Sequence, residues 1–593
     1  MLDPRIYRSG LVLVGLAVVV LAFSLLNQQG PLGSTLAPDA FNGPNAYSTM
    51  NTLAASYPYR QPGSAGDDAL ASEVAGSFRR NGLIVSVSTF RARAAVGTRT
   101  LETVTGTLPG SSSGSIVIVA HRDSLGSPAT ADLSGTATLI ELSEVLSGET
   151  QHRSVVLVST SGSAGASGSL QLARTLEGRV DAVIVLGDLA GLQIDGPIVV
   201  PWSNGQRVAP PMLRNTVAGA LSSQAALPSG GTSLAGQFAH LAFPFTVGEQ
   251  GPFGVYGYPS VLLSVSGERG PAPAETVQDA TRITALGRTV VSTVGALEGG
   301  ATIPAPSAYL LFSGMVVPEW AIRLLVLALI VPVLMATIDG VARVRRRGHS
   351  ITRWTIWVLA GAVPFVLAVV LVHALKLTTL IKVAPPGPVV AGAVPLHTAG
   401  AAILAGLALV LLLSFMFVRP AVIGLTGGEP AAGRQRGQPC NAGAGAAVLL
   451  VMSAAALAIW AENPFAAALL VPALHLWIWV VDPEVRPRAA VLVTLLALSL
   501  AAPVLVVLYY ALAFGLSPLE LAWAGTLLLA GGQIGIVAAV EWSVVLGCMA
   551  SVTVLGLQQA RAHRAEDVPV TVRGPITYAG PGSLGGTESA LRR

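Results

Sequence analysis

A short apolar run that ends in a polar cluster decides the fold of this chain. It spans Ser115–Ser124 and reads Ser-Ile-Val-Ile-Val-Ala-His-Arg-Asp-Ser. Its apolar part does not alternate with polar side chains, which is typical of a strand buried on both faces of a sheet. In α/β sheets the working residues follow the carboxyl ends of the strands. The run therefore predicts a strand over Ser115–Ala120, with His121 and Asp123 at a functional edge.

Similar runs of Val, Ile and Leu alternate with amphipathic stretches, and this alternation predicts an α/β domain. The segment that contains them, of about 270 residues, is large enough for a single core. The expected strands are Leu83–Phe90, Leu101–Leu108, Ser115–Ala120, Ser154–Thr160, Ala182–Leu186 and Ser260–Ser264. The expected helices are Asp67–Asn81, Ser134–Leu146, Ala166–Leu176, Pro211–Leu221 and Glu275–Leu297.

The composition excludes a wholly soluble protein. Of the 593 residues, 52% are hydrophobic and only 11% are charged, whereas soluble domains have about 25% charged residues. Cys440 and Cys548, the two cysteines, both lie in the C-terminal half, so the N-terminal half has no disulfide framework or cysteine zinc site. The net charge of +4 comes partly from basic clusters beside apolar spans, which indicates membrane topology and no nucleic-acid partner.

The apolar runs predict about eight membrane spans. The first, Leu11–Leu26, follows two arginines and lacks a small-residue cleavage site, which favours an uncleaved anchor with a cytoplasmic N-terminus. The second begins near Trp320 and ends at the basic cluster Arg343–Arg347, which should be cytoplasmic. The stretch Leu516–Val540 contains proline, glutamate and a glycine pair, which favours a re-entrant or interfacial segment. The other expected spans are Trp354–Leu375, Ala401–Val418, Ala446–Trp460, Ala466–Val481, Ala489–Phe514 and Glu541–Leu557.

These features divide the chain into four parts. Residues 1–29 form the cytoplasmic N-terminus and anchor, and residues 30–305 form an extracytoplasmic domain. Residues 306–557 form a membrane bundle of about seven helices, and residues 558–593 form a disordered cytoplasmic tail. We therefore expect a multi-pass protein of the cell membrane with both termini in the cytoplasm. The Ala- and Gly-rich composition favours a bacterium with a GC-rich genome.

Several segments, in chain order, resemble the motifs of the zinc aminopeptidases of peptidase family M 28. They are Arg60–Gly66, His121–Ser124, Ala131–Gly135, Val185–Leu189, Glu249–Phe253 and Tyr258–Ser260. The resemblance covers Arg60–Leu297 and implies a mixed α/β sheet that carries two zinc ions. It also implies that Ser115–Ala120, Ser154–Thr160 and Ala182–Leu186 are neighbouring strands, with His121, Ser163 and Asp188 beyond their ends.

The resemblance implies that part of the metal site is retained. His121 and Asp188 match two zinc ligands, and Asp123 matches the residue that orients the histidine from behind. The bridging carboxylate of the family aligns with Ala131, although Asp132 is one residue away and could replace it. His121, Asp188 and Asp132 are therefore the expected residual ligands.

The remaining positions of the family site have lost their chemistry. The general base aligns with Gly162, the neighbouring ligand with Ser163 and the final histidine ligand with Gln250. Glycine supplies no ligand, an amide is a poor one for zinc, and only a carboxylate at 162 would take a proton from a metal-bound water. Peptide hydrolysis by the family mechanism is thus expected to be disabled, with no cofactor or zinc only at low occupancy.

Each of these residues also has a structural interpretation. His121 would be an inherited residue that is hydrogen-bonded to Asp123 or Asp188, and Asp188 would cap the following turn. His240 and Glu249 lie near the late loop, where they could approach the site, or they would belong to a surface loop. Ser124, Ser127, Ser161 and Ser163 do not form the Gly-x-Ser-x-Gly elbow of a serine hydrolase. Ionisable residues in or beside the apolar runs are candidates for function or for interhelical hydrogen bonds, and they are Arg323, His373, His475 and Glu541.

The leading hypothesis is a polytopic membrane protein whose exterior domain keeps the aminopeptidase fold as a binding or assembly module. Its plan also resembles the peptidase-like subunit of GPI transamidase and membrane-tethered relatives of the peptidase family. The first alternative is an active zinc aminopeptidase with an atypical metal site. The second is a transporter with a receptor-like exterior domain. Expected partners are membrane lipids, other membrane or extracytoplasmic proteins, or a peptide ligand.

Overall fold

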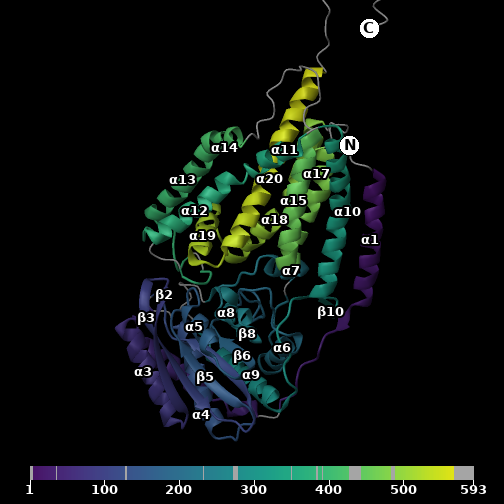
Figure 1. Cartoon of the computed structure of the whole chain (residues 1–593). Coiled ribbons are helices and arrows are strands. Elements are labelled where there is room, and N and C mark those ends of the chain that lie inside the picture. The colour runs from purple at the N-terminus through teal and green to yellow at the C-terminus, as the bar shows by residue number, and fades with distance from the viewer. Residues whose placement is uncertain are drawn as a thin grey trace, which may run out of the picture.

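The computed structural model describes residues 4–34, 37–126, 130–231, 233–270, 278–348, 350–381, 385–389, 392–426, 442–481 and 488–566. An α/β domain stands at one end of the molecule and a bundle of helices at the other, with the two in contact (Figure 1). Most of the predicted tail 558–593 lies outside the described residues, as does Ser127.

The α/β domain is built on a mixed sheet of seven strands in the order β2-β3-β5-β4-β6-β8-β7. The central strands β5, β4, β6 and β8 run parallel, whereas β2, β3 and β7 join through antiparallel pairing. The three strands predicted to be neighbours are β4, β5 and β6, which confirms that prediction. The strands are β2 (Ile84–Ala94), β3 (Gly97–Leu108), β4 (Gly114–His121), β5 (Ser154–Thr160), β6 (Arg179–Leu186), β7 (Val199–Val200) and β8 (Ser260–Leu263).

Helices cover both faces of this sheet. In β4, Ile116 and Ile118 belong to one buried cluster and Val117 and Val119 to another, because successive side chains of a strand point to opposite faces. The first cluster includes residues of α2 (Gly43–Ser56), α3 (Ala65–Arg80), α4 (Ser134–Ser147), α6 (Pro211–Ala225) and α9 (Ala280–Gly299). The second includes residues of α5 (Ser167–Thr175), α7 (Leu234–Ala242) and α8 (Gly251–Val255), and it continues into the bundle.

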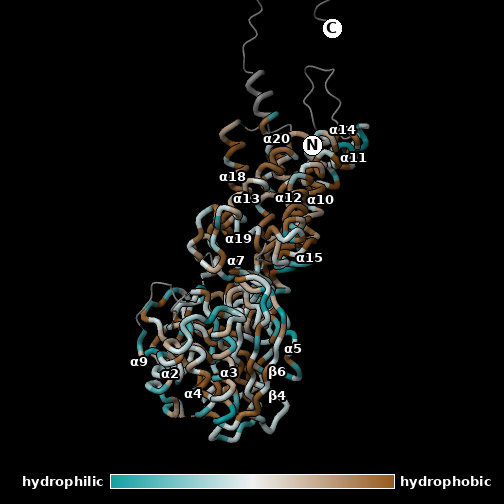
Figure 2. Tube along the Cα trace, turned by 90° about the vertical axis from the view of Figure 1, so that its left-hand side faces the viewer, coloured by the Kyte–Doolittle hydropathy of each residue, from teal (hydrophilic) through white to brown (hydrophobic). Residues whose placement is uncertain are grey.

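Eight helical segments in the described part of the chain are long and apolar enough to cross a membrane, which agrees with the predicted number. Figure 2 shows the apolar residues concentrated along the bundle, whereas the α/β domain is mixed. The bundle helices are α1 (Pro4–Phe23), α10 (Glu319–Arg346), α11 (Ile351–Leu359), α12 (Val363–Leu377), α13 (Thr398–Leu413), α14 (Arg419–Leu425), α15 (Ala442–Glu462), α16 (Pro464–Ala468), α17 (Val471–Val481), α18 (Ala489–Phe514), α19 (Pro518–Gly531) and α20 (Ile536–Glu566).

Helix α19 is too short to cross a membrane. Its 14 residues span roughly 21 Å at 1.5 Å per residue. It begins with a capping box between Ser517 and Glu520 and lies at the end of the bundle that meets the α/β domain (Figure 1). This agrees with the interfacial segment expected within Leu516–Val540.

The anchor helix differs from its predicted bounds. It ends at Phe23, and Leu26 instead pairs with Val316 in a small antiparallel sheet. That sheet consists of β1 (Leu26–Asn27), β10 (Met315–Pro318) and β9 (Tyr309–Phe312). It joins the end of α1 to the beginning of α10, so the last apolar residues of the run serve the sheet rather than the helix.

Candidate functional site

A histidine–glutamate pair lies at the carboxyl end of the central strand β4. Nδ1 of His121 is 3.1 Å from Oε2 of Glu249, and the two side chains are 18% and 6% exposed. The other oxygen of Glu249 accepts hydrogen bonds from Thr160 Oγ1 at 3.1 Å and Ser169 Oγ at 2.7 Å. Both oxygens of this carboxylate are therefore engaged by the protein.

The charges around His121 favour its protonated form. Burial disfavours the imidazolium, but the hydrogen bond to Glu249 and nearby negative charges outweigh it and raise the pKa of His121 to about 9. Those charges belong to Glu249, Asp123 and Asp132. Burial acts to raise the pKa of Glu249, yet its hydrogen bonds and the charge of His121 hold it below the ordinary value. The two side chains thus form an ion pair at neutral pH.

Asp123 orients the loop after β5 and does not hold His121. Its carboxylate accepts hydrogen bonds from Ser163 N at 3.1 and 3.2 Å and from Ser163 Oγ at 3.0 Å. Burial raises the pKa of Asp123 to about 7. The expectation that His121 pairs with Asp123 or Asp188 is wrong, because Glu249 reaches the imidazole from a distant loop.

Asp188 caps the turn that follows β6. Its Oδ1 accepts from Ala190 N at 3.0 Å and Gly191 N at 2.8 Å, and its Oδ2 accepts from Ser266 Oγ at 2.5 Å. Both oxygens of Asp188 thus accept hydrogen bonds from groups of the protein. The structural interpretation of Asp188 as a turn cap therefore describes its observed contacts.

The glycine at position 162 is required by the backbone. Its φ of +84° lies in the left-handed region that favours glycine. A Cβ at this position would approach Leu101 Cδ1 at 2.9 Å and Ser167 Cβ at 3.1 Å. A larger side chain at this position would therefore be strained and would require Leu101 or Ser167 to shift.

The remaining positions of the expected site are occupied by Gln250, Ala131 and Asp132. Gln250 is fully buried, and its Nε2 donates to Trp202 O at 3.2 Å and Thr246 Oγ1 at 2.9 Å. Ala131 is buried, whereas Asp132 is partly exposed on the same short turn.

The residues present do not fit the two-zinc centre that the resemblance implies. In the described ranges no group of three or more His, Cys, Asp or Glu side chains is arranged to hold a metal ion. Asp188 and Glu249 bind protein donors, and Gly162 and Gln250 supply no carboxylate or imidazole. The ligand role of His121, Asp188 and Asp132 stays a prediction.

Two further buried features lie at this edge, and the first of them was not predicted. Arg122 and Asp67 form a fully buried ion pair of 2.8 Å between Nε and Oδ1, and Asp67 Oδ2 accepts from Ser161 Oγ. Glu249 approaches the site, as one of its two alternatives predicted, and the other alternative of a surface loop is wrong, because Glu249 is 5% exposed. Glu249 is the only charged residue from 241 to 258, and an isolated charge in an apolar segment was the available signal.

Polar side chains fasten the α/β domain to the helix ends of the bundle. Gln206 Nε2 donates to Glu462 O at 2.8 Å, at the end of α15. Arg269 Nε donates to Ala513 O at 2.7 Å, near the end of α18, where its charge also suits the helix dipole. Asn463 Nδ2 donates in the other direction, to Leu241 O in α7 at 2.9 Å.

An aromatic cluster around His240 fills the centre of this junction. The imidazole stacks on Trp202 with ring centroids 4.6 Å apart, and Tyr509 and Tyr510 of α18 approach it edge-on. His240 is 6% exposed, so its expected place in a surface loop is wrong. Burial lowers the pKa of His240 to about 4, although its contact with Phe245 O opposes that shift.

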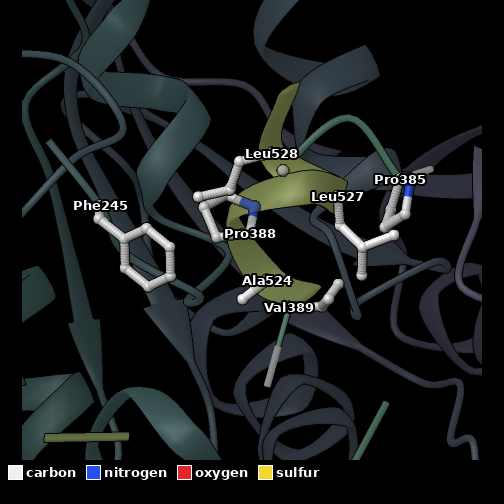
Figure 3. A pocket seen from close by; sticks show the side chains of 8 residues that line it. Phe245, Pro385, Pro388, Val389, Ala524, Leu527 and Leu528 are labelled. Atoms are coloured by element: carbon white, nitrogen blue, oxygen red, sulfur yellow. The ribbon is translucent and has the colours of Figure 1, made fainter. Parts of the chain in front are cut away.

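A small apolar cavity beside this cluster is a packing gap. Its volume is about 10 Å³, the size of one water molecule. It is lined by Phe245 of the α/β domain, by Leu527 and Leu528 of α19, and by Pro385 and Pro388 of the loop between α12 and α13 (Figure 3). It is too small for a ligand.

His475 is the deepest ionisable residue expected in the bundle, and it joins two helices. Its Nε2 donates to Leu329 O in α10 at 2.9 Å, and its Nδ1 accepts from Tyr7 Oη of α1 at 2.6 Å. Helices α1 and α10 also approach closely, because a Cβ at Gly10 would lie 2.7 Å from Pro332 Cα. These contacts fit the interhelical interpretation of His475.

The fold and the strand-end residues define a class: an α/β domain with a mixed sheet, similar to zinc-aminopeptidase-like folds, joined to a bundle of apolar helices. A zinc aminopeptidase of Bacillus subtilis is 12% identical, with a TM-score of 0.35, and the match covers 43% of this chain and 94% of that one. A glutaminyl cyclase of an Acidobacteriales bacterium is 18% identical, with a TM-score of 0.37 and coverages of 46% and 99%. A leucine aminopeptidase precursor of Bacteroides thetaiotaomicron is 12% identical, with a TM-score of 0.34 and coverages of 43% and 97%.

No protein family and no curated protein sequence matches this chain. The structural likenesses concern the fold alone and carry no information on the site. The assignment of the fold class rests on the strand order and strand directions described above.

Proposed function

We propose that this chain is a multi-pass membrane protein whose exterior domain is a binding or assembly module without peptidase activity. The observation that carries the proposal is the closed contact between His121 and Glu249 at the end of β4. The protein itself binds both oxygens of that glutamate. The pair of His121 and Glu249 therefore joins the end of β4 to the distant loop that carries Glu249.

The chemistry of hydrolysis supports the same proposal. A zinc peptidase needs a metal with an open position and a carboxylate that takes a proton from the bound water. By the resemblance, Gly162 is at the position of that carboxylate, and its positive φ together with the nearby Leu101 and Ser167 disfavours a larger side chain. The loss of a positioned general base costs roughly 10²–10⁴-fold in rate.

The contacts at the junction support a module that works with the bundle. Arg269 and Gln206 bind carbonyl oxygens at helix ends, and Asn463 of the bundle binds α7. The second buried cluster of the sheet runs without a break into the bundle. A ligand or partner bound by the exterior domain would therefore be coupled mechanically to the membrane helices.

The orientation is part of the proposal. The N-terminus and the far end of α20 lie at the end of the bundle away from the α/β domain (Figure 1). The last turn of α10, which also carries Arg343, Arg345 and Arg346, belongs to that end. Because basic residues favour the cytoplasmic side, we place the α/β domain outside the cell and both termini inside.

Metal analysis combined with an activity assay tests this proposal. The full chain is purified in detergent, dialysed against zinc and then against buffer, and analysed by mass spectrometry for metal and with aminoacyl chromogenic substrates for turnover. His121→Ala is the test variant, and His152→Ala, on an exposed loop, is the control. We expect little bound zinc and no turnover that depends on His121. Two zinc equivalents, with turnover lost only in His121→Ala, would overturn the proposal. One equivalent with the same loss would favour the first alternative, an active zinc aminopeptidase with an atypical metal site.

A further inference from the structure

A hollow of about 410 Å³ opens where the α/β domain meets the beginning of α10. One wall is the loop that carries Gln206 and Arg207, and another is the end of α8 with Gly254 and Val255. Ser307, which pairs with Val208, and Glu319, the first residue of α10, complete the lining. The hollow is separate from the strand-end pair of His121 and from the small cavity beside α19.

Arg207 gives the hollow its charge. Its side chain is exposed, and no hydrogen bond or ion pair joins its guanidinium to any described residue. A Cβ at Gly257 would lie 3.0 Å from its Nη1, so glycine leaves room for the guanidinium. A planar guanidinium presents a fork of donors that matches two oxygens of a phosphate.

The other charged residue that lines the hollow, Glu319, is paired within the protein. Glu319 accepts from Arg323 Nη2 at 2.9 Å, and Arg323 also donates to Trp460 O at 3.1 Å. Gln206 is used by the end of α15. The charge of Arg207 is therefore uncompensated, and the hydroxyl of exposed Ser307 is a second donor for an anion.

The position of the hollow favours an anion that belongs to a lipid. Trp320, next to Glu319, is 55% exposed, and Val255 and Tyr256 beside the hollow are 47% and 44% exposed. Exposed tryptophan and tyrosine at helix ends are typical of the level of the lipid headgroups. An exposed apolar rim next to a free guanidinium suits a ligand with a phosphate and an acyl chain.

We propose that this hollow binds the phosphate of a phospholipid headgroup, with Arg207 as its principal donor and Ser307 as a second one. The inference is independent of the proposed function, because it concerns another surface and holds whether or not the exterior domain hydrolyses peptides. It predicts that the junction binds a phospholipid through the phosphate of its headgroup.

Titration with a soluble short-chain lipid tests the assignment. The full chain in a neutral detergent is titrated with dihexanoyl phosphatidylglycerol, with dihexanoyl glycerol and with inorganic phosphate, and binding is followed by tryptophan fluorescence and by the shift in thermal unfolding. The variants are Arg207→Gln and Arg207→Lys, with Arg99→Gln on an exposed strand as the matched control. Far-ultraviolet circular dichroism of each variant verifies that it is folded.

We expect the phospholipid to bind more tightly than the uncharged lipid or phosphate alone. Loss of a charged hydrogen-bond donor in Arg207→Gln should weaken binding roughly tenfold or more. Arg207→Lys should fall between wild type and Arg207→Gln, and Arg99→Gln should bind like wild type. Equal affinity of wild type and Arg207→Gln for the phospholipid would contradict the proposed binding site. Equal affinity for phosphate and phospholipid would overturn the lipid as its ligand.

Discussion

At the scale of single residues, the strand-end site is defined by groups that satisfy one another. His121 and Glu249 pair across 128 positions of sequence, Asp123 holds Ser163, and Asp188 caps its own turn. A side chain already bound within the protein must lose those bonds before it can serve a ligand. These contacts stabilise the edge of the sheet, and a ligand would have to displace them in order to bind the same side chains.

Substitutions of Gly162 measure how strongly the loop after β5 disfavours a side chain at this position. In Gly162→Ala the left-handed backbone costs roughly 1 kcal/mol and the contact with Leu101 adds to it. We therefore expect a lower midpoint of thermal or denaturant unfolding, whereas Gly148→Ala, where the nearest atom would be 3.9 Å away, should have little effect. Gly162→Glu should be less stable still and inactive. Zinc-dependent aminopeptidase turnover in Gly162→Glu would show that the site needs only its base.

Glu249 tests the energetic role of the ion pair. Removing one partner of a buried pair typically costs about 3–5 kcal/mol, because the other charge is left uncompensated. We expect Glu249→Gln to lower the free energy of unfolding by a few kcal/mol. The control is Glu73→Gln, which breaks an exposed pair with Arg80 and should cost at most about 1 kcal/mol. Similar small effects of both substitutions would contradict the structural role of Glu249.

At the scale of elements, the junction is an assembly of helix ends and loops. Helix α7 contacts α16 and α18, and His240 of α7 lies among aromatic rings from both parts of the molecule. The groups that face this histidine are Trp202, Tyr509 and Tyr510, and Glu268 lies close enough to the two tyrosines to act on them. The imidazole is therefore neutral in the folded state.

Acidification should loosen the junction through His240. Its pKa is lowered from 6.5 to about 4, so the unfolded chain binds a proton that the folded chain does not between these values. Stability is present above pH 6.5 and is lost as the pH falls towards 4, by up to about 3 kcal/mol. Glu268, whose pKa burial raises to about 7, acts in the opposite direction over part of this range.

The comparison of wild type with His240→Gln isolates this effect, since Glu268 contributes to both proteins. Denaturant unfolding at several pH values should show an extra loss on acidification in wild type alone. Parallel pH profiles for the two proteins would mean that His240 does not titrate in this range.

The sequence predicts the central elements well and the contacts between distant ones poorly. Strands β4, β5 and β6 are continuous apolar runs, so their positions follow from local pattern. The partner of His121 does not, because Glu249 is brought to it only by the packing of a distant loop. The aromatic cluster of His240 likewise depends on how α18 meets the α/β domain, and no local pattern contains that information.

At the scale of the whole molecule, the domain and the bundle share one apolar cluster. It runs from Val117 and Val183 in the sheet through Phe253 to Trp477 in the bundle. Burial of such a continuous surface disfavours separate movement of the two parts. The molecule is therefore best described as one unit, with the α/β domain at one end and the bundle of apolar helices at the other.

The orientation of that unit can be measured with introduced cysteines. In a background that carries Cys440→Ser and Cys548→Ser, we expect Glu149→Cys to react with an impermeant thiol reagent in intact cells. Arg347→Cys, beyond the end of α10, should react only after permeabilisation, because its basic surroundings favour the cytoplasm. Both positions are exposed, so access to the reagent is limited by the membrane alone. The reverse pattern of labelling would invert the topology.

The central claim is that the end of β4 carries a closed His121–Glu249 pair in place of a metal centre. Its most direct test is a cryo-electron microscopy map of the full chain in lipid nanodiscs with excess zinc, at a resolution that shows side chains. We expect continuous contact between His121 and Glu249 and no metal density between His121 and Asp188. Strong density coordinated by both His121 and Asp188, with Glu249 turned away, would contradict it.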